Sequence, residues 1–315
     1  MNKFEEEYVS VNGIEHFLLH YPKGPEAPVL LYLHGGPGSF ESLFAYELDE
    51  IWGDMFTHVH WDQRGAGKTL RRNKKKGMPE TVEQMLDDLH GIIGHLQQKY
   101  QIHKVVVLGH SWGSLLGSLY VQRHPENVMA YIGVGQVISM LENERTAYRE
   151  VMEMAGKAGN QKHIQALNNM GDYPPRDPEL LLKLLPKMRK IQQAYDNGPL
   201  SGSGPGELIK TLRHSPSFQW GDLLSFTQIM KVNHPLHLQM LSFDLGQIPP
   251  RYQVPVHYIL GEADTITPAS LGSAYYDTID APRKTITMIP GAGHNPMYER
   301  MDEFAAALRA VRGTL

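Results

Sequence analysis

The sequence predicts an α/β protein with a mostly parallel sheet, helices on both faces and an inserted helical segment. Short, continuous apolar runs that end in glycine are typical of buried parallel strands. These runs alternate with segments whose apolar residues recur at helical spacing, which indicates helices covering both faces of the sheet. A stretch from about Gln136 to Pro250, rich in Met, Lys, Glu and Gln, predicts the helical insertion. Right-handed crossovers would gather the functional loops at the carboxyl ends of the strands.

The composition is that of an ordinary globular enzyme, with 41% hydrophobic and 20% charged residues in a chain of 315. The net charge of −4 gives no global attraction for nucleic acid or an anionic membrane. The chain has no cysteine, which excludes disulfides, thiolate metal sites and a cysteine nucleophile. The acidic N-terminus has no apolar core of a secretory signal, and no apolar run approaches a bilayer span. We expect a cytoplasmic protein without a membrane partner, although a lack of cysteine fits an exported protein equally well.

The first elements follow from turn and strand patterns. Residues 5–10 and 14–21 flank Asn12-Gly13, a dipeptide typical of a tight hairpin turn. Residues 28–36 and 55–62 are apolar runs that predict two buried strands. Residues 81–100 carry apolar side chains at helical period, and Thr81 with Gln84 predicts a capping box at the start of that helix.

The same alternation continues on both sides of the insertion. Strands are predicted at 103–110, 128–135, 254–261 and 284–291, and helices at 112–124 and 301–313. Within the insertion, helical patterns cover 144–159 and 177–198, and the glycine- and proline-rich residues 197–207 predict an irregular loop. The chain therefore divides into a first core segment (1–135), a helical cap (136–250) and a second core segment (251–315).

Ser111 is the predicted nucleophile. It lies in Gly109-His110-Ser111-Trp112-Gly113, which fits the pattern G-x-S-x-G, directly after a predicted strand and before a predicted helix. A serine on such a sharp turn has a strained backbone, and its hydroxyl projects above the edge of the sheet. The flanking glycines are needed because side chains there would collide with the neighbouring strand and helix.

A nucleophilic serine needs a base and a group that orients the base. His294, between small residues after the last predicted strand, is the expected base, and Asp264, after the preceding strand, is the expected acid. The order Ser111, Asp264, His294 is the order that this architecture imposes. Other acids are weaker alternatives, and His110, next to the nucleophile, is expected only to pack. These weaker acids are Glu262, Glu142 and Glu144.

An oxyanion hole is predicted from the loop at residues 34–39. Its two glycines let backbone N–H groups approach a substrate closely, and Pro37 stiffens the loop behind them. The second donor would be the backbone N–H of Trp112, and each such donor lowers a barrier by about 3 kcal/mol.

Residues 60–77 superficially resemble a nucleotide-binding site, because Gly67-Lys68-Thr69 ends like a phosphate loop and a basic run follows. A phosphate loop needs its first glycine at position 62, and that residue is Asp62. We therefore predict no nucleotide, and interpret the basic run as a solvated loop. His58 and His60 share a face of a strand without a third ligand, so we expect packing there and no metal or other cofactor. The basic run comprises Arg71, Arg72, Lys74, Lys75 and Lys76.

Taken together, "HGGPG", "DQRGAG", "GHSWG", "GEAD" and "GAGH" resemble, in order and spacing, the proline iminopeptidase branch of the α/β-hydrolase fold. The resemblance covers residues 1–135 and 251–315. It implies an eight-stranded, mostly parallel sheet with a helical cap over the serine. It also implies that Gly36 supplies the first oxyanion N–H, and that Asp62 and Arg64 tie down loops around the oxyanion hole.

The motifs leave the substrate class open. In that family, glutamates of the cap hold the free amino group of the substrate, often beside a Trp-Glu pair, whereas Trp220 here precedes Gly221. The resemblance predicts an aminopeptidase that releases N-terminal proline or small apolar residues from a short peptide. A carboxylesterase, lactonase or amidase acting on a small acyl compound is the alternative, and a non-catalytic ligand-binding module is a third. The acids available in the insertion are Glu142, Glu144, Glu150, Glu153, Glu179 and Glu207.

Overall fold

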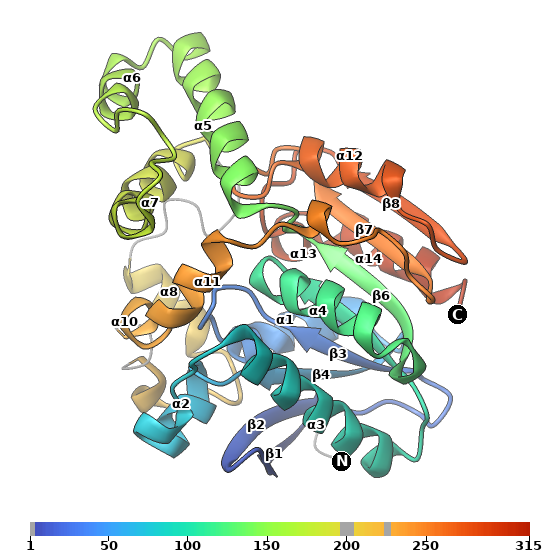
Figure 1. Ribbon diagram of the computed structural model, residues 1–315. Helices are drawn as coiled ribbons and strands as arrows, with labels where there is room; N and C mark the ends of the chain where they lie inside the picture. The colour runs from blue at the N-terminus through green and yellow to red at the C-terminus, as the bar shows by residue number, and fades with distance from the viewer. Residues whose placement is uncertain (1–3, 196–204, 224–227) are drawn as a thin grey trace.

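The computed structural model describes residues 4–195, 205–223 and 228–315 (Figure 1). Within these residues eight strands form one sheet in the order β1-β2-β4-β3-β5-β6-β7-β8. The β1–β2 and β2–β4 pairs are antiparallel and the other pairs are parallel, which confirms the predicted sheet. The strands are β1 Glu5–Val11, β2 Ile14–Tyr21, β3 Val29–Leu33, β4 Thr57–Asp62, β5 Val105–His110, β6 Val128–Val134, β7 Val256–Gly261 and β8 Lys284–Ile289.

Helices cover both faces of the sheet, so the core has two layers (Figure 1). Alternate residues of each strand point to opposite faces: Val105 and Val107 contribute to one cluster, Val106 and Leu108 to the other. The first cluster is closed by α3 Val82–Tyr100, α4 Trp112–Arg123 and α12 Ala269–Thr278. The second is closed by α1 Ala45–Trp52 and α14 Met301–Arg312.

The N-terminal hairpin forms as predicted. Asn12 and Gly13 have φ angles of 45° and 79°, the positive values that a tight turn between antiparallel strands requires. The guanidinium of Arg64 donates to the carbonyl of Asn12 at 3.3 Å and to both carboxylate oxygens of Asp88 in α3, at 2.7 and 3.0 Å. Arg64 therefore connects the hairpin, the segment after β4 and α3.

Of the two hydrogen bonds in the capping box predicted for α3, only the one accepted by Thr81 forms. The Thr81 hydroxyl accepts the backbone N–H of Gln84 at 3.1 Å, as predicted. The Gln84 side chain, however, accepts the N–H of Glu80 rather than that of Thr81. The helix therefore has an N-cap without the reciprocal bond that completes a box.

The basic run after β4 is helical rather than a loop, but most of it is exposed as predicted, since Arg72, Lys74, Lys75 and Lys76 all face solvent. It forms α2 Gly67–Asn73 and the short 3-10 helix η2 Lys74–Gly77. The Lys68 ammonium is buried and contacts the Ser217 carbonyl, while Arg71 forms an ion pair with Asp222 at 2.6 Å. Sequence periodicity could not detect these contacts because both partners lie about 150 residues further along the chain.

The chain between β6 and β7 is largely helical. Its first three helices share an apolar core of their own and extend away from the sheet at the upper left of Figure 1. The predicted loop at 197–207 falls mostly outside the described residues, and its last three residues begin a helix. No helix in the described ranges is long and apolar enough to cross a membrane. The helices are α5 Met140–Lys157, α6 Gln161–Asn168, α7 Pro178–Gln192, α8 Pro205–Leu212, α10 Ile229–Val232 and α11 His234–Leu241.

Candidate active site

Six parallel strands (β3 to β8) end at one edge of the sheet, and the segments that follow five of them (β3, β5, β6, β7 and β8) carry the candidate site. Leu33 is followed by the His34–Gly36 loop, His110 by Ser111, and Val134 by Gly135. The loops after Gly261 and Ile289 carry the candidate acid and base. Parallel order therefore brings together five segments that are far apart in the sequence.

Ser111 has the strained backbone predicted for it, with φ 53° and ψ −119°. Its backbone N–H donates to Val134 O at 2.9 Å. A Cβ added to Gly113 would lie 2.0 Å from Leu33 O in β3, and one added to Gly109 would lie 2.4 Å from Gly113 O in α4. The predicted need for both flanking glycines is therefore confirmed.

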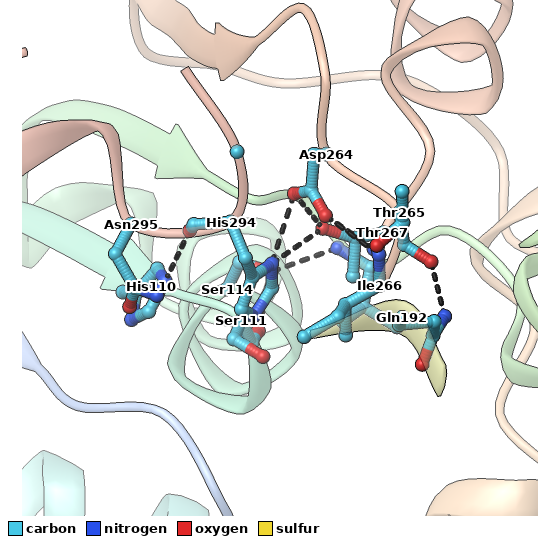
Figure 2. A network of polar contacts seen from close by, with 12 residues as sticks. His110, Ser111, Ser114, Gln192, Asp264, Thr265, Ile266, Thr267, His294 and Asn295 are labelled. Atoms are coloured by element: carbon cyan, nitrogen blue, oxygen red, sulfur yellow. Dashed lines mark hydrogen bonds and ion pairs between the residues drawn. The ribbon is translucent and has the colours of Figure 1, made fainter. Parts of the chain in front are cut away.

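The structure brings together the side chains of Asp264 and His294, whose roles were predicted from sequence (Figure 2). The Nδ1–H of His294 donates to Asp264 Oδ2 at 2.9 Å. Asp264 Oδ1 accepts the backbone N–H groups of Ile266 and Thr267 at 2.8 and 2.9 Å, and Oδ2 accepts the Thr267 hydroxyl at 2.7 Å. Burial raises the pKa of Asp264, but the charge of His294 and these hydrogen bonds outweigh it and hold the pKa below its usual value.

Thr267 is a site residue that the sequence analysis missed. Its hydroxyl lies 2.7 Å from Asp264 Oδ2 and 3.2 Å from His294 Nδ1, so it touches both members of the pair. The only signal in the sequence was its position three residues after an acid, the spacing at which a side chain can fold back onto the preceding turn.

Ser111 and His294 lie against the same short segment at the end of β6. Ser111 N donates to Val134 O, and a Cβ added to Gly135 would lie 3.1 Å from the His294 ring. The His110 ring, next to Ser111, has its centroid 4.9 Å from that of His294. Within the described chain, neither the Ser111 hydroxyl nor His294 Nε2 makes a hydrogen bond, whereas His294 Nδ1 is bonded to Asp264.

The alternative acids lie elsewhere. Glu262 is exposed, and Glu142 is an exposed partner of Arg145 on α5. Glu144 is buried, but its carboxylate is bound by Arg189 and by the Tyr173 hydroxyl, the latter at 2.5 Å. Among the candidate acids, Asp264 is therefore the one that the structure pairs with His294.

The loop with the candidate donor Gly36 passes close to Ser111, since a Cβ added to Gly35 would lie 3.3 Å from Ser111 Cβ, and Gln63 connects this loop with Trp112. Gln63 Nε2 donates to His34 O at 3.1 Å, its backbone N–H donates to His34 Nε2 at 3.1 Å, and its Oε1 accepts Trp112 Nε1–H at 2.9 Å. Gly36 has φ 117°, which disfavours any residue with a side chain. The Trp112 N–H is in the first turn of α4, where backbone donors have no partner within the helix. Gln63 was not predicted as a site residue, although it lies in the "DQRG" stretch that follows β4.

Two neighbours of this region are buried and carry perturbed pKa values. Burial lowers the pKa of His34 to about 4, so the ring is neutral and its Nδ1–H donates to Gly35 O at 2.8 Å. Burial also raises the pKa of Asp62 to about 6. Asp62 accepts the Ser42 hydroxyl at 2.6 Å and the Lys68 N–H at 2.8 Å, so it ties the segment after the glycine loop to α2.

His110 does more than the packing predicted for it. Its ring is 3% exposed, and its Nε2 lies 2.9 Å from His294 O (Figure 2). Its Nδ1 lies 3.2 Å from Glu41 Oε1. The burial agrees with the predicted packing, and the hydrogen bonds were not predicted because the acid partner lies 69 residues earlier in the chain.

The glutamates of the insertion differ in their surroundings. Glu153 and Glu179 are exposed and pair with Lys157 and His234. Glu150 is half-buried on α5 and is 3.5 Å from the Ser270 hydroxyl. Burial raises the pKa of Glu150, and the negative charge of Asp264 raises it further. Glu150 is therefore close enough to the candidate site to interact with the charge of Asp264. The side chain of Glu207 lies outside the described part of the chain.

His58 and His60 share a buried environment. His58 Nε2 lies 3.0 Å from Asp49 Oδ1, and His58 Nδ1 lies 3.0 Å from His60 Nε2. The described residues include no group of three His, Cys, Asp or Glu side chains arranged to hold a metal ion.

Comparison with known proteins adds independent observations. A family model described as alpha/beta hydrolase fold matches residues 28–300. A probable aminopeptidase, YbaC of Bacillus subtilis, is 25% identical over 305 residues, covering 95% of this chain and 93% of its own. A proline iminopeptidase of Thermoplasma volcanium is 21% identical over 305 residues, covering 96% and 95%.

Solved structures share the fold. A proline iminopeptidase of Mycobacterium smegmatis superposes with a TM-score of 0.67 at 19% identity, covering 98% of each chain. An esterase of Rhodococcus, RhEst1, superposes with a TM-score of 0.61 at 17% identity, covering 99% of each chain. At these identities the superpositions establish the fold alone. One of the two structures is named as a peptidase and the other as an esterase.

Proposed function

We propose that this chain, a hydrolase that belongs to the alpha/beta hydrolase fold family, cleaves its substrate through Ser111, His294 and Asp264. The observation that carries this proposal is the geometry at the sheet edge. A buried Asp264–His294 pair lies beside a serine whose strained turn leaves the hydroxyl free. We further propose that residues 136–250 form a cap over this edge.

The reaction would proceed through an acyl-enzyme. His294 Nε2 takes the proton of Ser111 as Oγ attacks the substrate carbonyl carbon, and Asp264 holds the imidazole in the required tautomer. The N–H groups of Gly36 and Trp112 stabilise the negative oxygen of the tetrahedral intermediate. His294 then returns the proton to the leaving group, and a water molecule hydrolyses the ester on Ser111 by the same steps.

An aminopeptidase is the substrate class that we favour. The relatives of similar length, YbaC and the iminopeptidase of Thermoplasma volcanium, carry aminopeptidase names. Glu150 supplies a suitable group, because it is a half-buried carboxylate that interacts with Asp264 and has no lysine or arginine within ion-pair distance in the described residues. We propose that Glu150 binds the free amino group of the substrate.

A small ester or lactone is the second candidate, and one observation favours it. The buried acid of the insertion, Glu144, is already neutralised by Arg189 and bonded by Tyr173. If Glu150 does not contact the substrate, the described cap has no other unpaired buried carboxylate for an ammonium group.

The two candidates are separated by assaying proline p-nitroanilide and p-nitrophenyl butyrate with four proteins. These are the wild type, Ser111→Ala, Glu150→Gln and, as a matched control on the same helix, Glu142→Gln. For an aminopeptidase we expect turnover of the proline amide, loss of it on N-acylation of the substrate, and a raised KM in Glu150→Gln only. For an esterase we expect turnover of the butyrate alone, unaffected by either glutamate variant.

Ser111→Ala decides the mechanism in both cases. We expect its turnover to fall by about 10⁴-fold or more with the fold unchanged by circular dichroism. Turnover close to wild type in Ser111→Ala would exclude the proposed mechanism for either substrate.

A further inference from the structure

A buried ion pair lies beside the proposed triad and is not used by the reaction. Glu41 begins the 3-10 helix η1 Glu41–Phe44 and its side chain is 13% exposed, whereas His110, the last residue of β5, is 3% exposed. Glu41 Oε1 and His110 Nδ1 are 3.2 Å apart. Burying two charges is costly unless both are paired and hydrogen-bonded, so the surroundings of the pair matter.

The carboxylate of Glu41 joins three segments. Its Oε1 accepts the backbone N–H of Gly35 at 3.1 Å as well as the Nδ1–H of His110. Its Oε2 accepts the hydroxyl of Tyr32 in β3. One side chain therefore connects the predicted oxyanion loop, the strand before it and the residue that precedes Ser111.

The other nitrogen of His110 fixes the protonation state of the ring. Nε2 faces the backbone carbonyl of His294 at 2.9 Å, and a carbonyl can only accept a hydrogen bond. Both ring nitrogens of His110 thus face acceptors, and only an imidazolium can donate from both. Burial lowers the pKa of His110, but the charge and hydrogen bond of Glu41 outweigh it and raise the pKa overall.

The same balance holds from the other side of the pair. Burial raises the pKa of Glu41, yet the charge and hydrogen bond of His110 outweigh it and bring the pKa to about 2. The remaining titratable groups that face His110 are His34, which is neutral, and the Asp264–His294 pair, of which Asp264 also favours the imidazolium.

We propose that Glu41 is a positioning residue that keeps His110 doubly protonated, so that the Glu41–His110 ion pair connects the Gly35 loop to the backbone of His294. The proposal rests on the proposed function, because it assumes that His294 is the base. Through this connection Glu41 sets the distance between the oxyanion loop and the base without touching the substrate. Misplacement of such groups by a fraction of an ångström is expected to reduce kcat rather than substrate binding.

The test compares Glu41→Gln with Tyr32→Phe. The first variant keeps the shape of the side chain and removes its charge, whereas the second removes a hydrogen bond to the same carboxylate and leaves the ion pair. With the faster of the two chromogenic substrates we expect Glu41→Gln to lower kcat by about 100-fold with KM within about threefold of wild type. Tyr32→Phe is expected to stay within about fivefold of wild-type kcat.

The protonation state of His110 distinguishes the proposed role of Glu41 from a purely structural role, because a structural role would not change it. Nitrogen NMR of labelled histidine, assigned with His110→Gln, should show both nitrogens of His110 protonated in the wild type at neutral pH. In Glu41→Gln the same ring should be neutral. Equal kcat in Glu41→Gln and wild type, an equal loss in Tyr32→Phe, or a His110 ring that is neutral in the wild type would each overturn the proposal.

A failure of the positioning role can be distinguished from a failure of the proposed function. Ser111→Ala, measured beside these variants, reports whether turnover depends on the nucleophile at all. If turnover does not depend on Ser111, the proposed function fails, and the positioning role fails with it. The NMR measurement would still show whether His110 and Glu41 form an ion pair. If it does depend on Ser111, the kcat of Glu41→Gln decides the positioning role alone.

Discussion

His294 Nδ1 lies 2.9 Å from Asp264 Oδ2, although the two residues are 30 positions apart and follow different strands. The carboxylate is held by two backbone N–H groups and one hydroxyl, so it needs no contribution from His294 to keep its orientation. His294 depends on Asp264 for its tautomer, whereas the orientation of Asp264 depends little on His294.

Asp264→Asn tests this dependence. The amide keeps the shape of the side chain but can present an N–H to Nδ1, which would favour the wrong tautomer of His294. We expect kcat to fall by about 10³- to 10⁴-fold, the size of effect seen when a triad aspartate is replaced by asparagine. The measurement is kcat on the substrate identified above, with Asp277→Asn on the exposed end of α12 as a control. A loss below tenfold would mean that His294 is not oriented by Asp264.

Gln63→Glu tests the connection between His34 and Trp112. The carboxylate can still accept Trp112 Nε1–H, but it cannot donate to His34 O, which would be left facing a negative charge. We expect kcat to fall by about 10- to 100-fold, with little change in KM, because one oxyanion support is displaced. Gln98→Glu, on the exposed face of α3, serves as the control. A variant in which KM rises and kcat is unchanged would place Gln63 in substrate binding instead.

Asp88→Asn is expected to reduce stability. It leaves the buried guanidinium of Arg64 without its two carboxylate bonds of 2.7 and 3.0 Å, in a site where both side chains are at most 3% exposed. We expect the free energy of unfolding to fall by about 3 kcal/mol or more, measured by urea denaturation. Glu15→Gln removes one partner of the exposed Arg72 pair and should cause no measurable change. Equal effects of the two substitutions would contradict the argument from burial.

Acid should destabilise the protein before most carboxylates protonate. Burial lowers the pKa of four histidines to about 4, below the ordinary value of 6.5, so between these values the unfolded chain binds more protons than the folded one. Stability from these groups is complete above pH 6.5 and is lost as the pH falls toward 4, by up to about 3 kcal/mol per histidine. The raised pKa values of Asp62, Glu150 and His110 act in the opposite direction, but burial also lowers the pKa values of His58 and His60, so the histidines with lowered pKa values outnumber the opposing groups. The histidines are His16, His34, His237 and His257.

The measurement is urea unfolding at several pH values between 7 and 4, with His257→Gln as the comparison. This variant removes one of the four groups, and its stability should depend less steeply on pH than that of the wild type. A free energy of unfolding that rises on acidification over this window would contradict the sign of the prediction.

Much of the fold was predictable because its signals are local. Apolar runs ending in glycine gave the strand positions within a few residues, and the Asn12-Gly13 turn depends only on the φ angles that these two residues tolerate. The strained turn at Ser111 was predictable for the same reason, since the glycines on either side are required by close approach of the backbone.

The errors share one cause. The basic run was predicted to be a loop because charge alone was considered, whereas it lies in α2 and η2, and its Arg71 pairs with Asp222 about 150 residues later. His110 was expected only to pack because its partner, Glu41, lies in another segment. Thr267 and Gln63 were missed because nothing in their immediate sequence marks a hydroxyl or an amide that will bridge two segments.

The sequence by itself determined the sheet, the turn that carries Ser111 and the identity of the residues predicted to act with it, because these depend on local backbone conformation and on chain order. Only the tertiary structure decided which charges are paired. Glu144 is neutralised by Arg189, whereas Glu150 forms no ion pair with any described lysine or arginine. His110 is held by Glu41 on one side and the backbone of His294 on the other. The pairing of buried charges depends on distances between segments that the packing of the whole chain sets, and no local pattern contains those distances.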